Sequence, residues 1–240
     1  MERETNYTIL QLQLGYTFQD QRLLLLALTH RSYLNEISHK SQDKGSLHNE
    51  RLEFLGDAVL ELIVTDHLFK NYPELPEGKL TAIRASLVNY RMLASIAEGM
   101  QVLDFIRLSR GERQDMTDRS KLPILADCFE AILGAVYLDG GLKNCEKIVE
   151  KHVFPLVEDI IKSEAYKDSK SRLQEYYQSL SKTTPHYQII AQEGKEHDKL
   201  FTVAVFAGTI QLSTGVGKSK QEAELDAATN ALEKIEFHNN

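Results

Sequence analysis

The sequence predicts an all-α domain followed by a small α+β domain. In residues 1–161, apolar side chains recur at helical spacings in one long segment after another. Residues 170–237 instead show the order of a helix, three short β-branched and aromatic runs, and a second helix. Residues 162–169 between them are polar and hold no large aliphatic side chain, which is typical of a linker. We therefore expect two domains, 1–161 and 170–237, joined by a linker at 162–169.

The composition limits the class of protein. With 240 residues, of which 42% are hydrophobic, the chain can form one sizeable core and a smaller one. Its net charge of −7 argues only weakly against a nucleic-acid partner, because a local basic patch can act within an acidic chain. No apolar run approaches the ~18 residues of a membrane span, and the N-terminus lacks a signal-peptide pattern. Cys128 and Cys145 form neither a disulfide framework nor a zinc spacing, so we expect a cytoplasmic protein with no membrane contact and no small-molecule cofactor.

Five helices are predicted in the first domain from apolar spacing and end signals. They are residues 21–34, 49–69, 77–99, 122–139 and 142–161. Asp20 is the expected N-cap of the first helix, and Pro155 is expected to kink the last one. The remaining segments are a short N-terminal stretch at 1–16, a polar loop at 37–47 and a charged, irregular stretch at 104–119.

The second domain is predicted to follow the order α-β-β-β-α. Its strands are rich in residues of high β propensity and are separated by polar or glycine-containing turns. The predicted helices are residues 171–180 and 220–235, and the predicted strands are residues 187–191, 200–206 and 210–214.

Three carboxylates share one stripe of the helix at 49–69. Glu50, Glu53 and Asp57 are three and four residues apart, so at about 100° per residue they lie on one side. That side also carries Phe54, and the rest of the circumference is apolar, which predicts a buried helix. Buried carboxylates need a positive partner, because removing an ion from water costs several kcal/mol. A hard divalent cation is one such partner, and an ordinary solvated helix face is the alternative.

A second pair of acids, Asp127 and Glu130, lies one turn apart in the apolar helix at 122–139. If the two helices pack together, they supply up to five carboxylates, an oxygen-rich site suited to Mg²⁺ or Mn²⁺. Such a site can orient water and stabilise the charge on an oxygen that leaves a phosphorus centre. Cys128 lies between these acids, but a soft thiol is a poor ligand for a hard ion, so we expect it in the core.

Four sequence blocks carry a family resemblance. The segment NERLEFLGDAVL at 49–60 resembles the signature of bacterial ribonuclease III. LTHRSY at 28–33, PEGKLTAIRASLV at 76–88 and LADCFEAILGAVYLD at 125–139 are similar to that family's other blocks, in the same order. The resemblance covers essentially the whole chain. It implies the ribonuclease III fold, a helical endonuclease domain that dimerises and has two catalytic sites in a shared valley.

The resemblance also implies roles for the acids. By motif position, Glu53, Asp127 and Glu130 bind the divalent metal. Asp57 and Glu130 are the catalytic acids, with Asp57 placed beside the metal to activate or position water.

Three further positions match the family pattern. Glu50 and Glu77 match two supporting acids near the scissile strand. Phe54 matches an aromatic residue that the family inserts into a pocket of the partner subunit, whereas its alternative interpretation is a core phenylalanine.

The second domain resembles a double-stranded RNA-binding domain. Its markers are Leu173-Gln174-Glu175, the segment GKEHDKLF at 194–201 and the segment GVGKSKQEAE at 215–224. Such domains recognise duplex RNA mainly by its shape, through 2′-hydroxyl and phosphate contacts. The expected RNA-contact residues are Gln174, Gln178, His197, Lys218 and Lys220.

The two lysines lie at the start of the final helix, with Ser219 as its expected cap. A helix N-terminus and nearby cations together favour a phosphate, whereas plain solvated charges are the alternative. Gln221 and Glu224 stand where the family commonly has basic residues. From residue 168 onward the chain has eight Lys and Arg against ten Asp and Glu, a net charge of 8 − 10 = −2. We therefore expect weaker and more salt-sensitive RNA binding than by a basic homologue.

The combined prediction is a homodimeric endoribonuclease for double-stranded RNA that depends on Mg²⁺, with Mn²⁺ as a substitute. The resemblance implies 5′-phosphate and 3′-hydroxyl ends with short 3′ overhangs, and ribosomal RNA precursors and structured mRNAs as substrates. A non-catalytic RNA-binding protein is the first alternative, but such a relative is expected to lose acids at positions 53, 57, 127 or 130, and all are present. A helical metal-dependent hydrolase of small phosphate esters is the second, and the RNA-binding tail argues against it.

Overall fold

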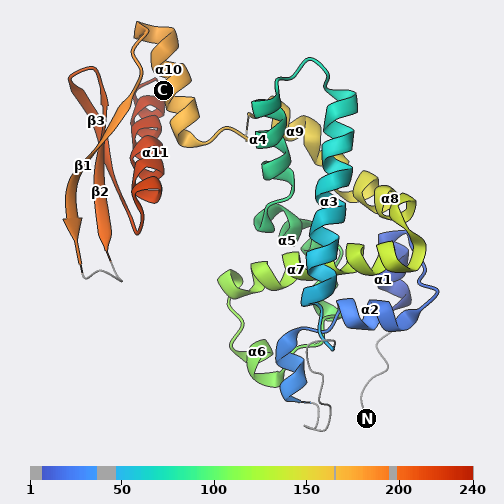
Figure 1. The fold of residues 1–240 in the computed structure, drawn as a ribbon. Coiled ribbons are helices and arrows are strands. Elements are labelled where there is room, and N and C mark those ends of the chain that lie inside the picture. Colours follow the sequence, from blue (N-terminus) through green and yellow to red (C-terminus); the bar gives the residue numbers. More distant parts are fainter. Residues whose placement is uncertain (1–6, 37–46, 165, 195–198, 240) are drawn as a thin grey trace. The chain divides into compact units, whose positions relative to one another are not determined.

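A computed structural model describes residues 7–36, 47–164, 166–194 and 199–239 of the chain (Figure 1). The chain divides into two compact units, 1–166 and 167–240. No helix in the described ranges is long and apolar enough to cross a membrane. Most of the predicted loop at 37–47, and His197, lie outside the described residues.

The regular elements of the first unit, in its described part, are helices. Its α-helices are α1 (Thr8–Leu14), α2 (Gln21–Ala27), α3 (Glu50–Asn71), α4 (Glu77–Leu87), α5 (Tyr90–Gly99), α6 (Arg110–Gln114), α7 (Asp118–Gly140), α8 (Leu142–His152) and α9 (Val157–Lys162). Short 3₁₀ helices are η1 (Arg31–Asn35), η3 (Val102–Asp104) and η4 (Phe154–Leu156). The long helices α3 and α7 cross and pack extensively on each other. The core around them includes the fully buried Leu60, Phe129 and Ile132.

The N-terminal segment is tied to the end of α7 by one carboxylate. Asp139 accepts hydrogen bonds from the Tyr16 hydroxyl at 2.7 Å and from the backbone N–H of Asp20 at 2.9 Å. Asp20 in turn accepts a hydrogen bond from the backbone N–H of Arg22, which confirms it as the N-cap of α2. The stretch predicted only as an N-terminal segment also contains α1.

Three predicted helices are interrupted in the structure. The helix expected at 77–99 is two helices, because the Asn89 side chain accepts hydrogen bonds from the N–H groups of Arg91 and Met92 and so starts α5. The helix expected at 21–34 ends at Ala27, and His30 caps the 3₁₀ turn η1. Around Pro155 the chain forms η4 between α8 and α9, so the expected kink is a break.

The helix expected at 122–139 is longer than predicted at its start. It begins at Asp118 because Thr117 and Ser120 form a capping box. The stretch at 104–119, expected to be irregular, therefore contains the start of α7 as well as α6 and part of η3.

The prediction that the helix at 49–69 is buried nearly all round was wrong. Phe54, Leu62 and Phe69 are 81%, 57% and 72% exposed. Residues on the opposite side, such as Leu60 and Val64, are fully buried against the core. Apolar residues all round a helix therefore do not prove burial within one chain, since a second molecule can cover an apolar face.

The second unit has the predicted α-β-β-β-α order. Its elements are α10 (Ser169–Ser181), β1 (His186–Glu193), β2 (Leu200–Ala207), β3 (Ile210–Gly217) and α11 (Lys220–Asn239). The strands form an antiparallel sheet in the order β1-β2-β3, and both helices lie on one face of it (Figure 1). The small core is formed mainly by Leu173, Val205 and the alanines of α11.

Close packing of α11 on β3 depends on small residues on both elements. A Cβ atom added at Gly215 would lie 2.1 Å from the backbone nitrogen of Ala227. Ala223 and Ala227 are fully buried at this contact.

Candidate active site

The acids of the predicted metal site come from the middle of the nuclease unit, where α3 and α7 cross. α3 begins beside the segment that contains LTHRSY, because the backbone N–H of Asn49 donates to the Thr29 carbonyl at 2.9 Å. Asn49 itself is buried. This contact fixes the start of the helix, so Glu53 is held one turn further on, at the crossing.

Glu53, Asp127 and Glu130 form what we call the acid cluster. One carboxylate oxygen from each lies within 4.8 Å of the others, and all three residues are half-buried. Two of them lie on α7 and one on α3. Among the described residues, no lysine, arginine or histidine forms an ion pair with any of the three.

Burial and the close approach of the acids raise their pKa values. Burial, with the nearby charges of Asp127, Glu50 and Asp57, raises the pKa of Glu53 to about 7. Burial and the charges of the neighbouring acids, led by Asp57, raise the pKa of Glu130 to about 8. The pKa of Asp127 is also raised, mainly by burial and Glu50. The cluster thus concentrates negative charge in a partly desolvated place.

A hard divalent cation fits this arrangement. Carboxylate oxygens are the ligands that Mg²⁺ and Mn²⁺ prefer. A cation at the centre of the acid cluster would neutralise carboxylates that form no ion pair among the described residues, and would lower the raised pKa values. The half-buried position leaves one side of the cluster accessible to solvent and to a substrate.

Asp57 and Glu50 lie at the edge of the acid cluster. Asp57 is exposed, and its charge contributes to the raised pKa values of both Glu53 and Glu130. Glu50 is exposed and lies 3.5 Å from the guanidinium of Arg31, measured from Oε1 to Nη1. Arg31 also opposes the rise in the pKa of Asp127. Arg31, which the sequence pattern did not single out, therefore borders the site.

Glu77 does not lie at the acid cluster of its own chain. It is the first residue of α4 and lines a hollow at the other end of α3. Phe69 lines the same hollow. It lies 16 positions after Glu53 on α3, which is about 24 Å along the helix. A role near the scissile strand would therefore require Glu77 to act at the site of a second copy.

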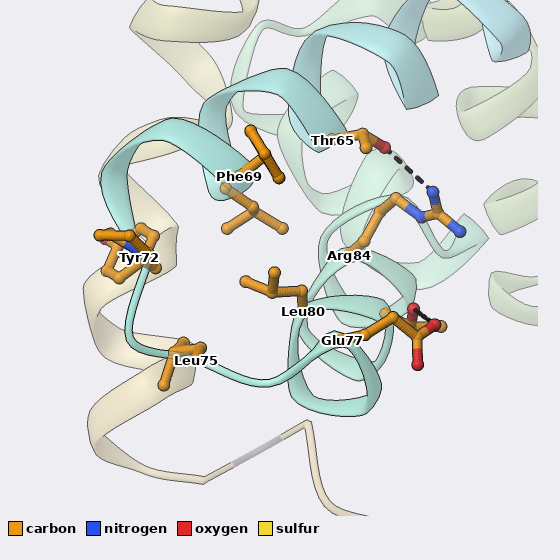
Figure 2. A pocket seen from close by; sticks show the side chains of 10 residues that line it. Thr65, Phe69, Tyr72, Leu75, Glu77, Leu80 and Arg84 are labelled. Carbon is orange, nitrogen blue, oxygen red and sulfur yellow. Dashed lines mark hydrogen bonds between the residues drawn. The ribbon is translucent and has the colours of Figure 1, made fainter.

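The hollow at the end of α3, which we call the α3–α4 hollow, has a volume of about 630 Å³ (Figure 2). Glu77 accepts a hydrogen bond from the Thr81 hydroxyl at 3.1 Å, and Arg84 donates to the Thr65 hydroxyl at 3.0 Å. The apolar residues around it are Leu68, Phe69, Tyr72, Pro73, Leu75 and Leu80.

Phe54 projects from the exposed side of α3, one residue after Glu53. With 81% of its surface exposed, it is not a core residue of its own chain. It borders a second hollow of about 860 Å³, which is also lined by Leu23, Leu26 and Leu138.

In the second unit, the described RNA-contact candidates are all exposed. Gln174 and Gln178 lie one turn apart on α10. Lys218 and Lys220 flank Ser219 at the start of α11, and the Ser219 hydroxyl accepts a hydrogen bond from the N–H of Glu222 at 3.1 Å, which confirms it as the cap.

Two acids of α11 modify the expected phosphate site. Glu222 accepts a hydrogen bond from the backbone N–H of Lys218 at 2.8 Å, so a carboxylate occupies part of this helix start. Glu224 is paired with Lys170 of α10 at 2.6 Å. Lys170 also lies over the ring of Tyr187, so its charge is engaged within the domain. Both acidic residues thus form contacts within the domain.

The comparisons with known proteins agree with both units. Residues 20–157 match the family described as ribonuclease-III-like, and residues 169–235 match the double-stranded RNA binding motif. The helical unit with its acid cluster and the tail together define an endoribonuclease that binds double-stranded RNA.

Several relatives and a solved structure identify the family. The chain is 43% identical to Ribonuclease 3 of Streptomyces coelicolor, over 96% of this chain and 80% of the relative. It is 42% identical to Ribonuclease 3 of Magnetococcus marinus, over 94% and 92%. A solved nuclease domain of ribonuclease III from Campylobacter jejuni, studied for its dimer-forming region, aligns with a TM-score of 0.55 and 38% identity, over 62% of this chain and 97% of that domain. The chain belongs to the ribonuclease III family.

Proposed function

We propose that this endoribonuclease cleaves double-stranded RNA with Mg²⁺ held by Glu53, Asp127 and Glu130, and that Mn²⁺ can substitute. The acid cluster is the observation that supports this, because its carboxylates lie within 4.8 Å of one another and lack an ion-pair partner among the described residues. A bound Mg²⁺ supplies Lewis-acid stabilisation of the charge that develops on the phosphate oxygens.

The acids that border the cluster orient the reactants. Asp57 is exposed and electrostatically close to Glu53 and Glu130, so we assign it the positioning of the attacking water. The water attacks phosphorus in line, and the 3′ oxygen leaves. This direction of attack gives 5′-phosphate and 3′-hydroxyl ends.

The proposed active form is a symmetric dimer. In a two-fold dimer with antiparallel α3 helices, Phe54 of one copy would enter the α3–α4 hollow of the other. Phe54 and Phe69 are both exposed and lie about 22 Å apart along α3. Antiparallel α3 helices would therefore bring Phe54 of one copy beside Phe69 of the other. This arrangement would bring Glu77 of the second copy to the acid cluster of the first, in agreement with its proposed supporting role alongside Glu50. Paired sites of this kind cut both strands and leave short 3′ overhangs.

The proposed substrates are ribosomal RNA precursors and structured mRNAs in the cytoplasm. The tail supplies duplex RNA binding through Gln174, Gln178, Lys218 and Lys220, and His197 is proposed as a further contact. These residue types suit contacts to 2′-hydroxyl groups and phosphates, which report duplex shape rather than sequence.

A gel assay on a long perfect RNA duplex tests the proposed reaction. The duplex is incubated with Mg²⁺ and with EDTA, beside the matched single strand and a DNA duplex. We expect cleavage of the RNA duplex alone, and only with Mg²⁺. A duplex that is shifted but uncut in Mg²⁺ would contradict the proposed reaction, and cleavage in EDTA would contradict the metal dependence.

A further inference from the structure

The two longest helices of the nuclease unit meet through a reciprocal pair of glycines. A Cβ atom added to Gly56 of α3 would lie 1.8 Å from the carbonyl oxygen of Glu130. A Cβ atom added to Gly134 of α7 would lie 2.2 Å from the carbonyl oxygen of Leu52. Both obstacles are backbone atoms, which cannot swing aside as the end of a flexible side chain can. The backbones of α3 and α7 are therefore in direct contact at this crossing.

Each glycine lies against the backbone of the acid cluster. Gly56 faces Glu130 itself, and Gly134 faces Leu52, the residue before Glu53. The cluster takes one carboxylate from α3 and two from α7. The distance between the two backbones therefore sets how closely Glu53 can approach the two acids of α7.

We propose that Gly56 and Gly134 are positioning residues for the divalent metal, a role that rests on the metal site proposed above. They do not touch the metal; they allow the helices to approach until the three carboxylates converge. An alanine at position 134 would require a shift of about 1 Å, because an ordinary contact begins at 3.4 Å and the added atom would lie at 2.2 Å. Metal–oxygen distances tolerate only about 0.2 Å, so this shift would remove a ligand from the bound ion.

Binding of Mn²⁺ to the full chain tests the proposal without a cleavage assay. The EPR signal of free Mn²⁺ decreases as the ion binds, and this decrease measures the affinity. We expect Gly134→Ala to bind Mn²⁺ about 10- to 100-fold more weakly than the unmodified chain. Duplex RNA binding in EDTA should be unchanged. Gly99→Ala is the matched control, because nothing lies within 4 Å of a Cβ atom at this position in α5, and its Mn²⁺ affinity should be unchanged.

A second measurement separates metal binding from stability, since a Cβ atom at the crossing also destabilises the fold. A metal that binds only the folded state raises the urea midpoint. We expect Mn²⁺ to raise the midpoint of the unmodified chain and of Val149→Ala, a buried destabilising control in α8, and to raise that of Gly134→Ala by clearly less. If Gly134→Ala is unfolded without urea, refolding is followed by titration with an osmolyte, with and without Mn²⁺.

The outcomes distinguish the two proposals. Equal Mn²⁺-induced shifts in Gly134→Ala and Val149→Ala would overturn the positioning role of the glycines. Absence of Mn²⁺ binding by the unmodified chain would instead overturn the metal site itself.

Discussion

Glu130 is the most buried acid of the cluster, and the charges of acids on both helices act on it. It is more buried than Glu53 and Asp127, and the charges of Asp57, Asp127 and Glu53 all act on it. At the scale of single residues, the structure therefore predicts that function depends on the charge of this side chain rather than on its packing.

Glu130→Gln keeps the shape of the side chain and removes its charge. We expect cleavage of duplex RNA to fall by more than about 100-fold. Loss of a residue that only supports a metal ligand already lowers activity by about 10- to 100-fold, and loss of the ligand itself should lower it at least as much. RNA affinity in EDTA should stay near that of the unmodified chain, since the proposed RNA contacts lie elsewhere. Cleavage assays and filter binding on the same duplex measure both effects, and full cleavage by the variant would exclude Glu130 from the site.

The raised pKa values predict an unusual pH dependence of stability in EDTA. Folding raises the pKa of Glu53 from 4.5 to about 7 and that of Glu130 from 4.5 to about 8. At a pH between 4.5 and about 8, the folded state binds more protons at these two groups than the unfolded chain does. Their contribution to the free energy of unfolding therefore falls as pH rises. This contribution is fully present below pH 4.5 and is lost as pH rises through about 8.

Urea unfolding at a series of pH values in EDTA measures this dependence. The double variant Glu53→Gln, Glu130→Gln should show a smaller loss of stability with rising pH. Added Mg²⁺ should stabilise the unmodified chain more at higher pH, because the metal competes with protons for the same carboxylates. An identical pH profile for the unmodified chain and the double variant in EDTA would show that the two acids are not protonated as expected.

At the scale of elements, the start of α11 is where we propose that the tail contacts RNA. Ser219 caps the helix, and the flanking Lys218 and Lys220 are exposed. Glu222 lies at the same helix start and accepts a hydrogen bond from the Lys218 amide. Two lysines are therefore available to contact a phosphate, and the negative charge of Glu222 reduces their attraction for it.

Replacing Lys218 and Lys220 together by alanine should weaken duplex RNA binding equally for all sequences. The slope of log affinity against log salt should fall by about two, because each phosphate contact contributes about one. Lys234→Ala is the control, because it also removes one positive charge per residue but lies far from the proposed contact. Lys234 follows Lys220 by 14 residues on α11, which is about 21 Å. An unchanged slope in the double variant would remove these lysines from the RNA interface.

At the scale of the whole molecule, the exposed apolar side of α3 indicates that one chain does not complete the nuclease. Phe54, Leu62 and Phe69 are exposed on the same helix that supplies Glu53. The α3–α4 hollow opens beside Phe69 and holds Glu77 at its edge (Figure 2). In the dimer proposed above, a second copy covers this surface and brings Glu77 to the acid cluster.

Phe54→Asp should produce a folded monomer with greatly reduced cleavage. The phenylalanine is 81% exposed in the single chain, so its removal costs little folding stability, whereas a charge in the apolar α3–α4 hollow of a second copy would be strongly unfavourable. Leu80→Asp, in the hollow itself, should disrupt the dimer as well. Sedimentation measures the assembly state, and Leu12→Asp, exposed on α1, should remain dimeric. A Leu80→Asp protein that is folded and dimeric would contradict this choice of hollow.

The sequence by itself determined features that depend on neighbours along the chain. The periodicity of apolar residues predicted most helices and strands, and the capping residues Asp20 and Ser219 were recognisable from their type and position. The family followed from short blocks such as NERLEFLGD. The helix break at Asn89 was missed, because the apolar face continues through it and local spacing does not reveal an interruption. The break around Pro155 was expected only as a kink.

Only the tertiary structure decided how the distant segments meet. It brings Glu53 to Asp127 and Glu130, raises their pKa values, and places Glu77 at the opposite end of α3. It also exposes Phe54, which the apolar pattern of α3 alone left open between core and interface. The spacing of Gly56 after Glu53, and of Gly134 after Glu130, was visible in the sequence, but their contact was not. Helical periodicity specifies which residues share a face, whereas the approach of two helices depends on the packing of atoms far apart in the chain.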